Sequence, residues 1–464
     1  MAGEEARSYH PRAMAATRTR KIQILHTLLR AGDNRRLRRT LARQDDVQIA
    51  SQLDNLDVED QLRVMQLLPN DRRPEVVEAM RHETAAELVA RLAPEEAAKL
   101  LDELEVDDVV DILGRIDEEQ LRQILGRLDV DDANELEELL AYDENTAGGL
   151  MSPQYFQISP DATVGDALSM IQDEEEPPET AFYVYAVDVD GRLVGVCSLR
   201  MLVISRPSEK IRDVMERDVV RVTADTDQEE VAEIVSRYDL LAVPVVDEFD
   251  VMLGLVEVDD VVDVIREEAT EDILKMAGAG EELAEARTFS GSFRVRWRWL
   301  LAAAAGGTAA ALSLSGFDEA LASVPALAFF MPVVAGMGGN VGMQSSTIVV
   351  RGLAVGFVEA SRVRRLVVRE VSLGASLGLI YGLLIALASV AVGEGVDPLR
   401  LGAVVMLGTA GSMTIAAAVG TCTPLVLDRF GVDPAVATGP FVTTSVDVMG
   451  LIFYFWLATV LIGI

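Results

Sequence analysis

Basic side chains are scarce in the C-terminal part of this chain. The segment from Trp297 to Ile464 contains 8 Arg, no Lys and 9 acidic residues, a net charge of −1 over 168 residues. The other 296 residues therefore carry −33 of the total charge of −34. Such a surface repels phosphates, which argues against a nucleic-acid partner, and it attracts cations. An acidic half followed by an almost uncharged half also excludes an ordinary cytosolic globule.

Cysteine is rare as well. Cys197 and Cys422 lie far apart in apolar sequence and lack the spacing of a zinc site or a disulfide framework, so we expect both to be packing residues. The first apolar stretch, residues 22–29, is too short for the core of a signal peptide. We therefore expect a cytoplasmic N-terminal half that begins with a disordered tail over residues 1–20.

An apolar residue recurs every twelve positions from Leu56 to Leu140. The segments that follow these residues begin with Pro or acidic residues and then place apolar residues at helical spacing, as in LAPEEAAKL and LEVDDVVDIL. This pattern predicts an all-α superhelical domain of stacked short helices over residues 21–144. Its acidic helix starts form either a solvated face or a surface for divalent cations.

Residues 145–266 change to Val-rich strands that alternate with helices, and they repeat internally. MSPQYFQISPDATVGDALSMI is echoed 64 residues later by MERDVVRVTADTDQEEVAEIV, and GRLVGVCSLRML is echoed by DVMLGLVEVDDVV. Each copy reads strand, helix, strand, turn, strand and helix. The segment resembles a tandem pair of α+β CBS domains. That resemblance implies either an adenine nucleotide such as ATP between the copies or a pair that only couples other domains.

The remaining sequence reads as a connecting helix and a membrane domain. Residues 267–296 are charged and amphipathic, and they end in Arg and Trp residues typical of a membrane interface. From residue 297 on, five apolar stretches can each cross roughly 30 Å of hydrocarbon: residues 299–317, 321–350, 371–392, 401–427 and 435–464. Charges in the connections predict a cytoplasmic N-terminus and a C-terminus outside. We thus expect a multidomain protein with a five-helix transmembrane domain over residues 297–464.

Asp447 is the only ionisable side chain within these five stretches. A charged Asp at the centre of a membrane helix costs about 2.5–3.5 kcal/mol on insertion scales, so it normally faces water or a partner. Since the stretches contain no Lys or Arg to pair with it, we expect a cation site in a pore. Residues one to two turns earlier can add hydroxyl and carbonyl oxygens: Gly439, Pro440, Thr443 and Thr444.

The second apolar stretch contains two amides, Asn340 and Gln344, one helical turn apart and surrounded by glycines. Amides on one face of a helix can bind the water shell of an ion, or they can hydrogen-bond to another helix. Both interpretations stay open, and the first makes these residues part of the pore lining.

The chain as a whole resembles the MgtE family of magnesium channels over residues 20–464. The specific motifs are GGNVGMQSSTIVVRGL in the second apolar stretch and DPAVATGPFVTTSVDVMG in the fifth. The resemblance implies a homodimer in the cell membrane, Mg²⁺ as the ion, and Asp447 as the principal pore ligand. Gly439 departs from the family pattern, where a side-chain amide is expected, so only its backbone can contribute there.

Acidic residues of the CBS pair and of the fourth connection are the candidate sensors of intracellular Mg²⁺. Like-charged surfaces repel, and bridging divalent cations would close the assembly against the pore. The expected regulatory ligands are Asp213, Asp225, Asp227, Asp247, Asp250, Glu257, Asp259, Asp260, Asp263 and Asp433. For Asp433 two roles stay open: sharing a cation with acids of the connecting helix, or capping the fifth apolar stretch.

The expected function is a Mg²⁺-selective channel that carries divalent cations into the cytoplasm and is closed by intracellular Mg²⁺. The alternatives are a broader Co²⁺ and Mn²⁺ transporter, or a transporter of another ion controlled by adenine nucleotide. An intramembrane aspartyl protease needs two carboxylates, and the stretches contain one. An anion transporter needs cationic side chains or helix N-termini in its pore, and the stretches contain no Lys or Arg. We therefore expect no enzyme.

Overall fold

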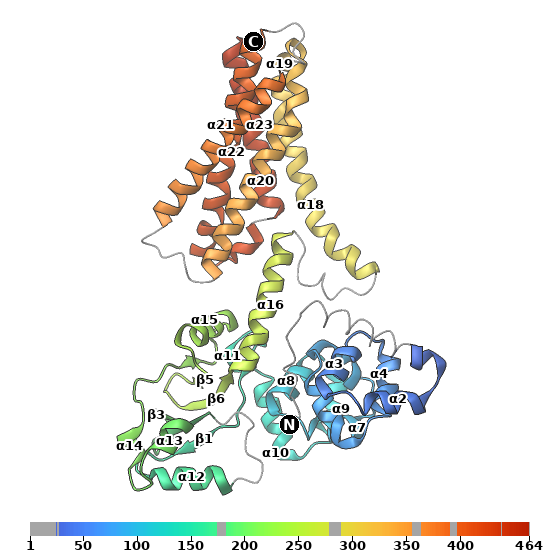
Figure 1. Ribbon diagram of the computed structural model, residues 1–464, viewed down its shortest axis with the longest axis vertical. Coiled ribbons are helices and arrows are strands. Elements are labelled where there is room, and N and C mark those ends of the chain that lie inside the picture. Colours follow the sequence, from blue (N-terminus) through green and yellow to red (C-terminus); the bar gives the residue numbers. More distant parts are fainter. Residues whose placement is uncertain are drawn as a thin grey trace, which may run out of the picture. The chain divides into compact units, whose positions relative to one another are not determined.

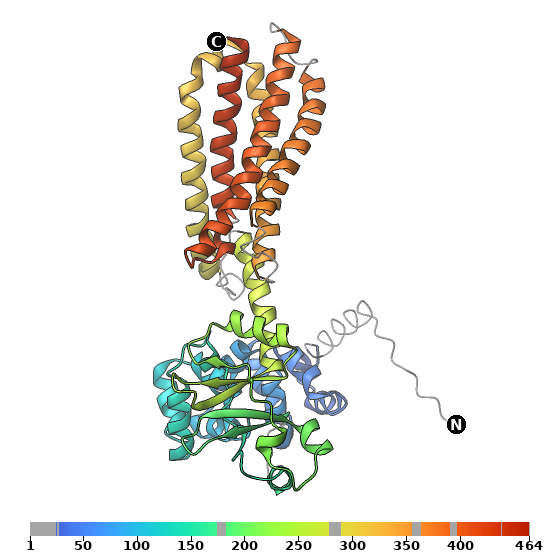
Figure 2. The same ribbon diagram turned by 90° about the vertical axis from the view of Figure 1, so that its left-hand side faces the viewer.

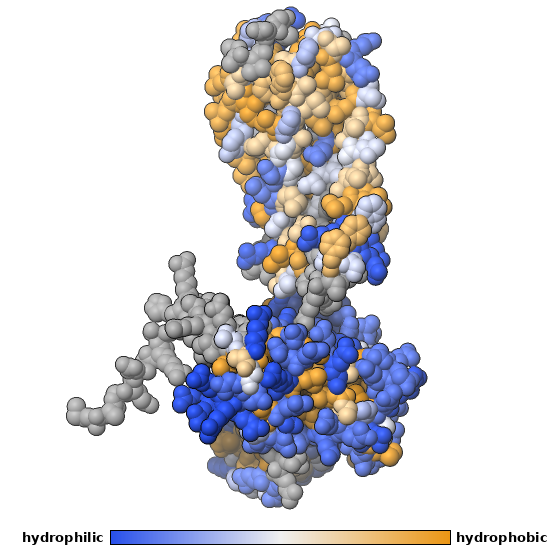
Figure 3. All heavy atoms as spheres, turned by 90° about the vertical axis from the view of Figure 1, so that its right-hand side faces the viewer, coloured by the Kyte–Doolittle hydropathy of each residue, from blue (hydrophilic) through white to orange (hydrophobic). Residues whose placement is uncertain are grey.

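A computed structural model of the protein describes residue 25 and residues 27–173, 182–277, 289–354, 363–389, 397–437 and 439–463 (Figures 1 and 2). The chain divides into two compact units, Met1–Val264 and Ile265–Ile464. Hydrophilic residues cover most of the visible surface of the first unit, and hydrophobic residues cover much of the second (Figure 3). The predicted tail over residues 1–20 lies outside the described residues.

Short helices joined by turns form the first part of the first unit. In chain order they are α2 (Asn34–Leu41), α3 (Asp46–Leu53), α4 (Val58–Met65), η1 (Asn70–Arg72), α5 (Arg73–Glu78), α6 (His82–Val89), α7 (Pro94–Leu101), α8 (Val106–Gly114), α9 (Glu118–Leu125) and α10 (Val130–Leu139). From α3 on, a helix or η1 begins every twelve residues, which confirms the predicted period. Each recurring apolar residue from Leu56 to Leu128 stands two positions before such a start, where it fixes the entry of the chain into the helix.

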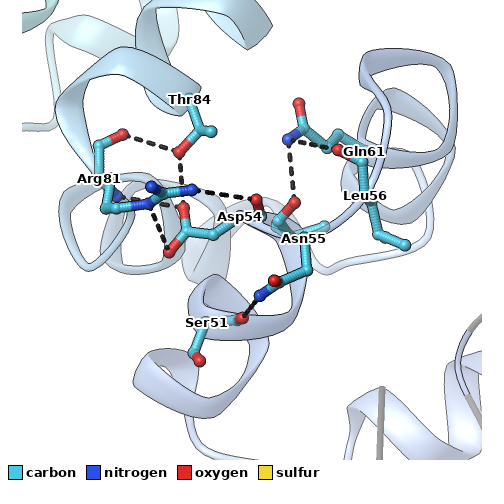
Figure 4. Close-up of polar contacts among 8 residues, drawn as sticks. Ser51, Asp54, Asn55, Leu56, Gln61, Arg81 and Thr84 are labelled. Carbon is cyan, nitrogen blue, oxygen red and sulfur yellow. Dashed lines mark hydrogen bonds and ion pairs between the residues drawn. The ribbon is translucent and has the colours of Figure 1, made fainter. Parts of the chain in front are cut away.

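Alternate helices of this segment pack on one another, α3 on α5, α4 on α6 and α6 on α8. Polar contacts join them at the turns (Figure 4). The Asp54 carboxylate after α3 accepts hydrogen bonds from the Thr84 hydroxyl at 2.5 Å and from the backbone N–H of Arg81 at 3.2 Å. Buried Gln61 donates to the carbonyl of Leu53 at 2.9 Å. These bonds satisfy helix ends that the repeat buries.

The second part of the first unit contains two copies of a small α+β fold, preceded by α11 (Ala147–Leu150). The first copy comprises β1 (Phe156–Ile158), α12 (Val164–Asp173), β2 (Tyr183–Val187), β3 (Leu193–Ser198), α13 (Leu199–Ile204) and α14 (Ile211–Val214). The second comprises β4 (Val222–Thr223), α15 (Gln228–Tyr238), β5 (Ala242–Val246), β6 (Met252–Glu257) and α16 (Val258–Met276). Each sheet has one parallel and one antiparallel strand pair, with an irregularity at the same place, so the predicted duplication is confirmed.

The two copies contact each other, and the second copy packs on the helical repeat. The backbone N–H of Leu193 donates to the carbonyl of Asp250 at 2.9 Å, which joins the hairpin turns of the two sheets. The N–H groups of Ala147 and Gly148 donate to carbonyls next to β4. Buried residues of β5 and α16 share one hydrophobic core with the helical repeat. The helical repeat and the second copy thus form one body.

The second unit is a bundle of long helices. It begins within α16, at Ile265. Its other elements are α18 (Phe289–Leu314), η2 (Ser315–Phe317), α19 (Asp318–Ser323), α20 (Ala326–Ala354), α21 (Val363–Ser389), α22 (Pro398–Arg429), η3 (Pro434–Ala437) and α23 (Pro440–Ile462). Among the described residues, five helices are long and apolar enough to cross a membrane, which is the number expected. They run along one another in Figures 1 and 2.

Three details of the sequence-based prediction need correction. The third apolar helix begins at Val363 and includes Glu370, which is 4% exposed, so Asp447 is not the only ionisable residue in the five helices. The segment expected to be one connecting helix is shared between α16 and α18, and residues 278–288 lie outside the described residues. Cys197 is buried as expected, but Cys422 is exposed. Hydropathy placed the start of α21 too late, because four charged residues precede the apolar part of this helix.

Small residues bring the bundle helices into backbone contact. A Cβ atom added at Gly378 of α21 would lie 2.6 Å from the Cα of Ala410 in α22, and one at Gly374 would lie 2.8 Å from the carbonyl oxygen of Met413. A Cβ at Gly420 of α22 would clash with the carbonyl of Gly342 in α20. Helices that approach so closely gain van der Waals contact, which is what stabilises association in lipid.

Candidate functional site

Asp447 lies in α23, in a turn that packs on two other helices. The Cβ of a side chain at Gly338 or Gly342 of α20 would approach Val446 to within 3.2 Å, and one at Gly450 would clash with Ser412 of α22. The Asp447 carboxylate is itself partly exposed, and among the described residues no group donates a hydrogen bond to it or pairs with it. The bundle therefore holds an unpaired carboxylate on a firmly packed backbone.

The polar residues one to two turns before Asp447 are engaged with their own helix. The Thr443 hydroxyl donates to the carbonyl of Gly439, the N-cap of α23, at 3.1 Å. The Thr444 hydroxyl donates to the carbonyl of Phe441 at 3.3 Å, and its side chain lies against Gly306 of α18. Pro440 is the first residue of α23. Within one chain, Thr444 thus faces α18, and the carbonyl of Gly439 already accepts from Thr443.

Asn340 and Gln344 lie on the exposed face of α20. The opposite face, which contains Gly338 and Gly342, packs on α22 and α23. The two amides are therefore on one face, as predicted, but a single chain does not enclose them. Exposed amides among lipid tails are costly, so this face needs water or another polar surface.

Glu370 is a buried carboxylate that sequence reasoning missed. Its Oε2 accepts a hydrogen bond from Ser345 of α20 at 3.2 Å, and its Oε1 pairs with Arg369 at 2.9 Å. The available signal was its spacing, because Glu370 is followed at four-residue intervals by the glycines that contact α22. The carboxylate ties α20 to α21 directly after Gln344, and its two bonds distinguish it from Asp447.

Six carboxylates from α8, the end of β6 and the start of α16 lie close enough to feel one another's charges. Three were predicted as regulatory ligands: Glu257, Asp259 and Asp260. The other three, Asp107, Asp108 and Asp111, come from α8 and were not predicted. Their signal was the sequence VDDVVDIL, which nearly repeats the VDDVVDVI of α16.

Burial and mutual repulsion raise the pKa values of this acidic cluster. Burial first, and then the neighbouring Asp107, raise the pKa of Asp108 to about 8. Burial and the charges of Asp259 and Asp107 raise the pKa of Glu257 to about 8. Burial also raises the pKa of Asp107 to about 6, and burial with Asp107 raises that of Asp260 well above its ordinary range. The ionised cluster is therefore unstable without a compensating charge.

His82, at the start of α6, supplies one such charge. Its Nδ1 lies 2.9 Å from the Asp111 carboxylate and its Nε2 lies 3.7 Å from that of Asp108. Burial lowers the pKa of His82, but the hydrogen bond to Asp111 and the two carboxylate charges outweigh it and raise the pKa to about 8.

The other predicted ligands of the CBS-like copies are placed elsewhere. Asp227 caps α15, and the Asp247 carboxylate accepts from two N–H groups of its own turn. Asp250, with a φ of 65°, pairs with Arg221 at 2.8 Å. The remaining three are Asp225, which accepts from Thr223, and the exposed residues Asp213 and Asp263. Within the described part of the chain, no three metal-ligating side chains converge closely enough to hold a metal ion by themselves.

Asp433 contacts both η3, the short helix before α23, and a lysine of α16, so neither role is found in the form that the sequence left open. Its Oδ1 accepts from the backbone N–H of Ala435 at 2.7 Å, which caps η3, and its Oδ2 lies 2.6 Å from the Nζ of Lys275 in α16. Lys275 also pairs with Glu271. Burial and then the charge of Asp433 raise the pKa of Asp272 to about 6. The cation between the helix acids and Asp433 is thus a lysine side chain in this structure.

These features define a class: a multi-pass membrane protein whose helix bundle holds an unpaired carboxylate and whose first unit contains an acidic helical repeat and a CBS-type pair. Family models match in the same order. They are the MgtE intracellular N domain over residues 44–145, the CBS domain over 147–205 and 211–267, and MgtE, described as a divalent cation transporter, over 331–457.

Known proteins of this kind are similar over most of the chain. The magnesium transporter MgtE of Bacillus subtilis is 37% identical over 332 residues, 71% of this chain and 73% of its own length. That of Thermus thermophilus is 40% identical over 331 residues, 71% and 72% of the two lengths. A solved cytosolic domain of the Mg²⁺ channel MgtE in complex with ATP is 35% identical, covers 52% of this chain and 98% of its own, and has a TM-score of 0.39. The chain belongs to the MgtE family, whose named relatives are transporters and not enzymes.

Proposed function

We propose that this protein is a Mg²⁺ channel of the cell membrane that carries the ion into the cytoplasm and is closed by intracellular Mg²⁺. The observation that carries the proposal is the unpaired Asp447 carboxylate in a glycine-packed apolar helix. An ionised side chain in such a place is costly unless it faces a hydrated path, and a passing cation compensates its charge. The named relatives support Mg²⁺ as that cation.

A homodimer would complete the pore. Asn340 and Gln344 lie on an exposed face of α20, and one chain supplies one Asp447. A two-fold axis next to this face would place two carboxylates and four amides around one path. Mg²⁺ keeps most of its octahedral waters in proteins, so a wide polar path with two carboxylates suits it better than a closed cage of ligands. The N-terminus would be cytoplasmic and the C-terminus outside.

The acidic cluster is the proposed sensor. Burial, and after it the charges of neighbouring carboxylates, raise the pKa values of Asp107, Asp108, Glu257 and Asp260. Carboxylate oxygens suit Mg²⁺, and an ion that keeps its waters needs only one or two of them as direct ligands. Mg²⁺ would thus hold α8 against the start of α16. Binding of an adenine nucleotide such as ATP between the CBS-type copies stays a prediction.

Ion flux into liposomes tests the transport proposal. With the purified chain in the bilayer and an indicator inside, a Mg²⁺ gradient is expected to drive uptake, whereas protein-free liposomes show only leakage. The same assay with Mn²⁺, Co²⁺ and Ca²⁺ separates a Mg²⁺ channel from a broader divalent-cation transporter. Absence of uptake for all four ions, with the protein folded and inserted, would contradict the proposal.

The stability of the first unit should fall as pH rises when no divalent cation is present. A carboxyl group with a raised pKa in the folded state favours folding below its ordinary pKa of 3.8, and this contribution is lost as pH rises through about 6 for Asp107 and about 8 for Asp108. His82 acts in the same direction, since its contribution to stability is present below pH 6.5 and is lost as pH rises through about 8. One pKa unit corresponds to about 1.4 kcal/mol, so we expect a loss of a few kcal/mol at most.

Urea unfolding of residues 1–264, followed by circular dichroism in chelator, measures this loss between pH about 5 and about 8.5. Millimolar Mg²⁺ should restore the free energy of unfolding at the higher pH but change little at the lower one. The variant Asp108→Asn should flatten the profile. A stability that rises with pH in chelator would contradict the proposed sensor.

A further inference from the structure

The first turns of α18 carry an exposed stack of aromatic rings. The ring centroids of Phe289 and Phe293 lie 6.3 Å apart, and those of Phe293 and Trp297 lie 6.1 Å apart, with interplanar angles of 25° and 15°. The three side chains are 88%, 58% and 56% exposed. Because they follow one another at four-residue intervals, they form one stripe along the helix, which exposed Leu300 and Leu301 extend.

Arginine side chains flank this stripe on both sides. At about 100° per residue, Arg296 lies beside the rings on one side of the helix, and Arg294 and Arg298 lie on the other. All three are exposed, whereas Val295 on the opposite face is buried. None of the three forms an ion pair with a described residue. The helix thus presents a row of aromatic rings between free guanidinium groups.

Other arginines of the second unit lie at the same end of the bundle. Helices α21 and α22 are antiparallel, since Gly374 faces Met413 and Gly382 faces Met406, so α21 begins near the end of α22. The arginines at that end include Arg351, Arg364, Arg365, Arg369 and Arg429. In Figure 1 the first turns of α18 diverge from the other helices of this unit, so the bundle does not cover the aromatic stripe.

We propose that Phe289, Phe293, Trp297 and their flanking arginines bind an anionic phospholipid of the leaflet from which α18 enters the membrane. A planar guanidinium group can donate two parallel hydrogen bonds to a phosphate. This pairing is less favourable with a zwitterionic headgroup, because the headgroup's own cation competes for the phosphate. Aromatic rings at a helix end anchor at headgroup depth, next to the glycerol and the upper acyl chain. One lipid thus matches both features of this surface, because its headgroup carries the charge that the arginines need and its acyl chain contacts the aromatic stripe.

A lipid fits this surface better than a protein does. The stripe is continuous with an apolar helix long enough to cross a membrane, so its rings meet the bilayer without any change of direction. A second copy of the chain would bring guanidinium groups against guanidinium groups, which is unfavourable. Anionic lipids, in contrast, concentrate near basic residues that adjoin a span.

The fluorescence of Trp297 can show which lipids lie next to it. The other tryptophans, Trp299 and Trp456, are replaced by Phe in the full-length protein, which is reconstituted in phosphatidylcholine vesicles. A minor, equal mole fraction of brominated phosphatidylglycerol or of brominated phosphatidylcholine is then added, and quenching of Trp297 is compared. We expect the anionic lipid to quench more strongly, by on the order of fivefold in apparent affinity, and the difference to shrink at high salt.

The double variant Arg294→Gln and Arg298→Gln should abolish this preference, while Arg400→Gln at the start of α22, the other end of the bundle, should leave it intact. Replacing both by Lys keeps the charge and loses the paired hydrogen bonds, so it should retain part of the preference and also guards against a folding defect of the Gln variant. Equal quenching by the two lipids overturns the proposal. The proposal is also overturned if neither lipid reaches Trp297, as a second copy would cause. A preference that inorganic phosphate removes, while chloride at the same ionic strength leaves it intact, would overturn it as well.

Discussion

Asp447→Asn is expected to lower Mg²⁺ flux through the reconstituted protein by at least about tenfold, because each 1.4 kcal/mol of lost ion stabilisation changes occupancy of the site tenfold. The substitution keeps the size of the side chain and removes its charge. Among the described residues nothing donates to the carboxylate, so Asn leaves no buried partner unpaired. The packing of α23 on α20 and α22 rests on Val446 and Gly450 and should persist.

A matched control separates the role of this charge from a general loss of acidity. Asp428 is an exposed acid near the end of α22, and Asp428→Asn makes the same chemical change outside the packed part of the bundle. It should leave flux within about twofold of the original, because exposed charges are screened by salt. Size-exclusion chromatography shows whether the variants assemble alike. Near-normal flux with Asn at position 447 would refute the electrostatic account of the pore.

The parts of the fold that depend on neighbours along the chain could be predicted. The twelve-residue period predicts where each short helix begins, because from α4 on an apolar residue stands two positions before each start in this period. An aspartate side chain also caps α3, α4, α9 and α10. The duplicated strand pattern and the five apolar helices follow from periodicities of the same local kind. Asp447 was visible for a similar reason, since its apolar surroundings are adjacent in sequence.

The parts that depend on tertiary approach were missed. Asp107 and Asp108 look like ordinary acids of a helix start, and only the folded chain brings them to Glu257 and Asp260. Glu370 follows several arginines, so hydropathy places it outside the membrane helix. Its burial comes from the glycine contacts of α21 with α22 and from its bond to Ser345. Lys275 likewise gave no signal, because its partner Asp433 lies in a distant connection.

Lys275→Met is expected to make the contact between α16 and η3 depend on divalent cations. In the structure one ammonium group pairs with both Glu271 and Asp433, and the side chains of Glu271 and Lys275 in α16 are only 21% and 22% exposed. Without that charge the carboxylates of Glu271, Asp272 and Asp433 repel one another. A hydrogen bond between charged groups contributes about 1.5–3 kcal/mol, so the joined state should lose at least about tenfold in population in chelator.

Spin labels on α16 and at the end of α22 can measure this contact directly. Thr270 and Phe430 are exposed and lie in the second unit, so cysteines at these positions, with Cys422 replaced by Ser, carry the labels. Labelled chains are diluted with unlabelled ones so that only distances within a chain are recorded. The original protein should give one short distance with or without Mg²⁺. Lys275→Met should give a long distance in chelator and recover the short one in Mg²⁺.

Three variants distinguish a tethered cation from a simple packing residue. Lys275→Arg keeps the charge and should behave like the original, whereas a packing role predicts that it disturbs the contact as Met does. Adding Asp433→Asn to Lys275→Met removes one of the repelling carboxylates, so the distance in chelator should shorten and its response to Mg²⁺ should weaken. The cap on η3 survives in that variant, because the Asn side-chain oxygen can still accept from Ala435. If Lys275→Met keeps the short distance in chelator, Lys275 does not hold this contact. Packing alone would then keep α16 next to η3.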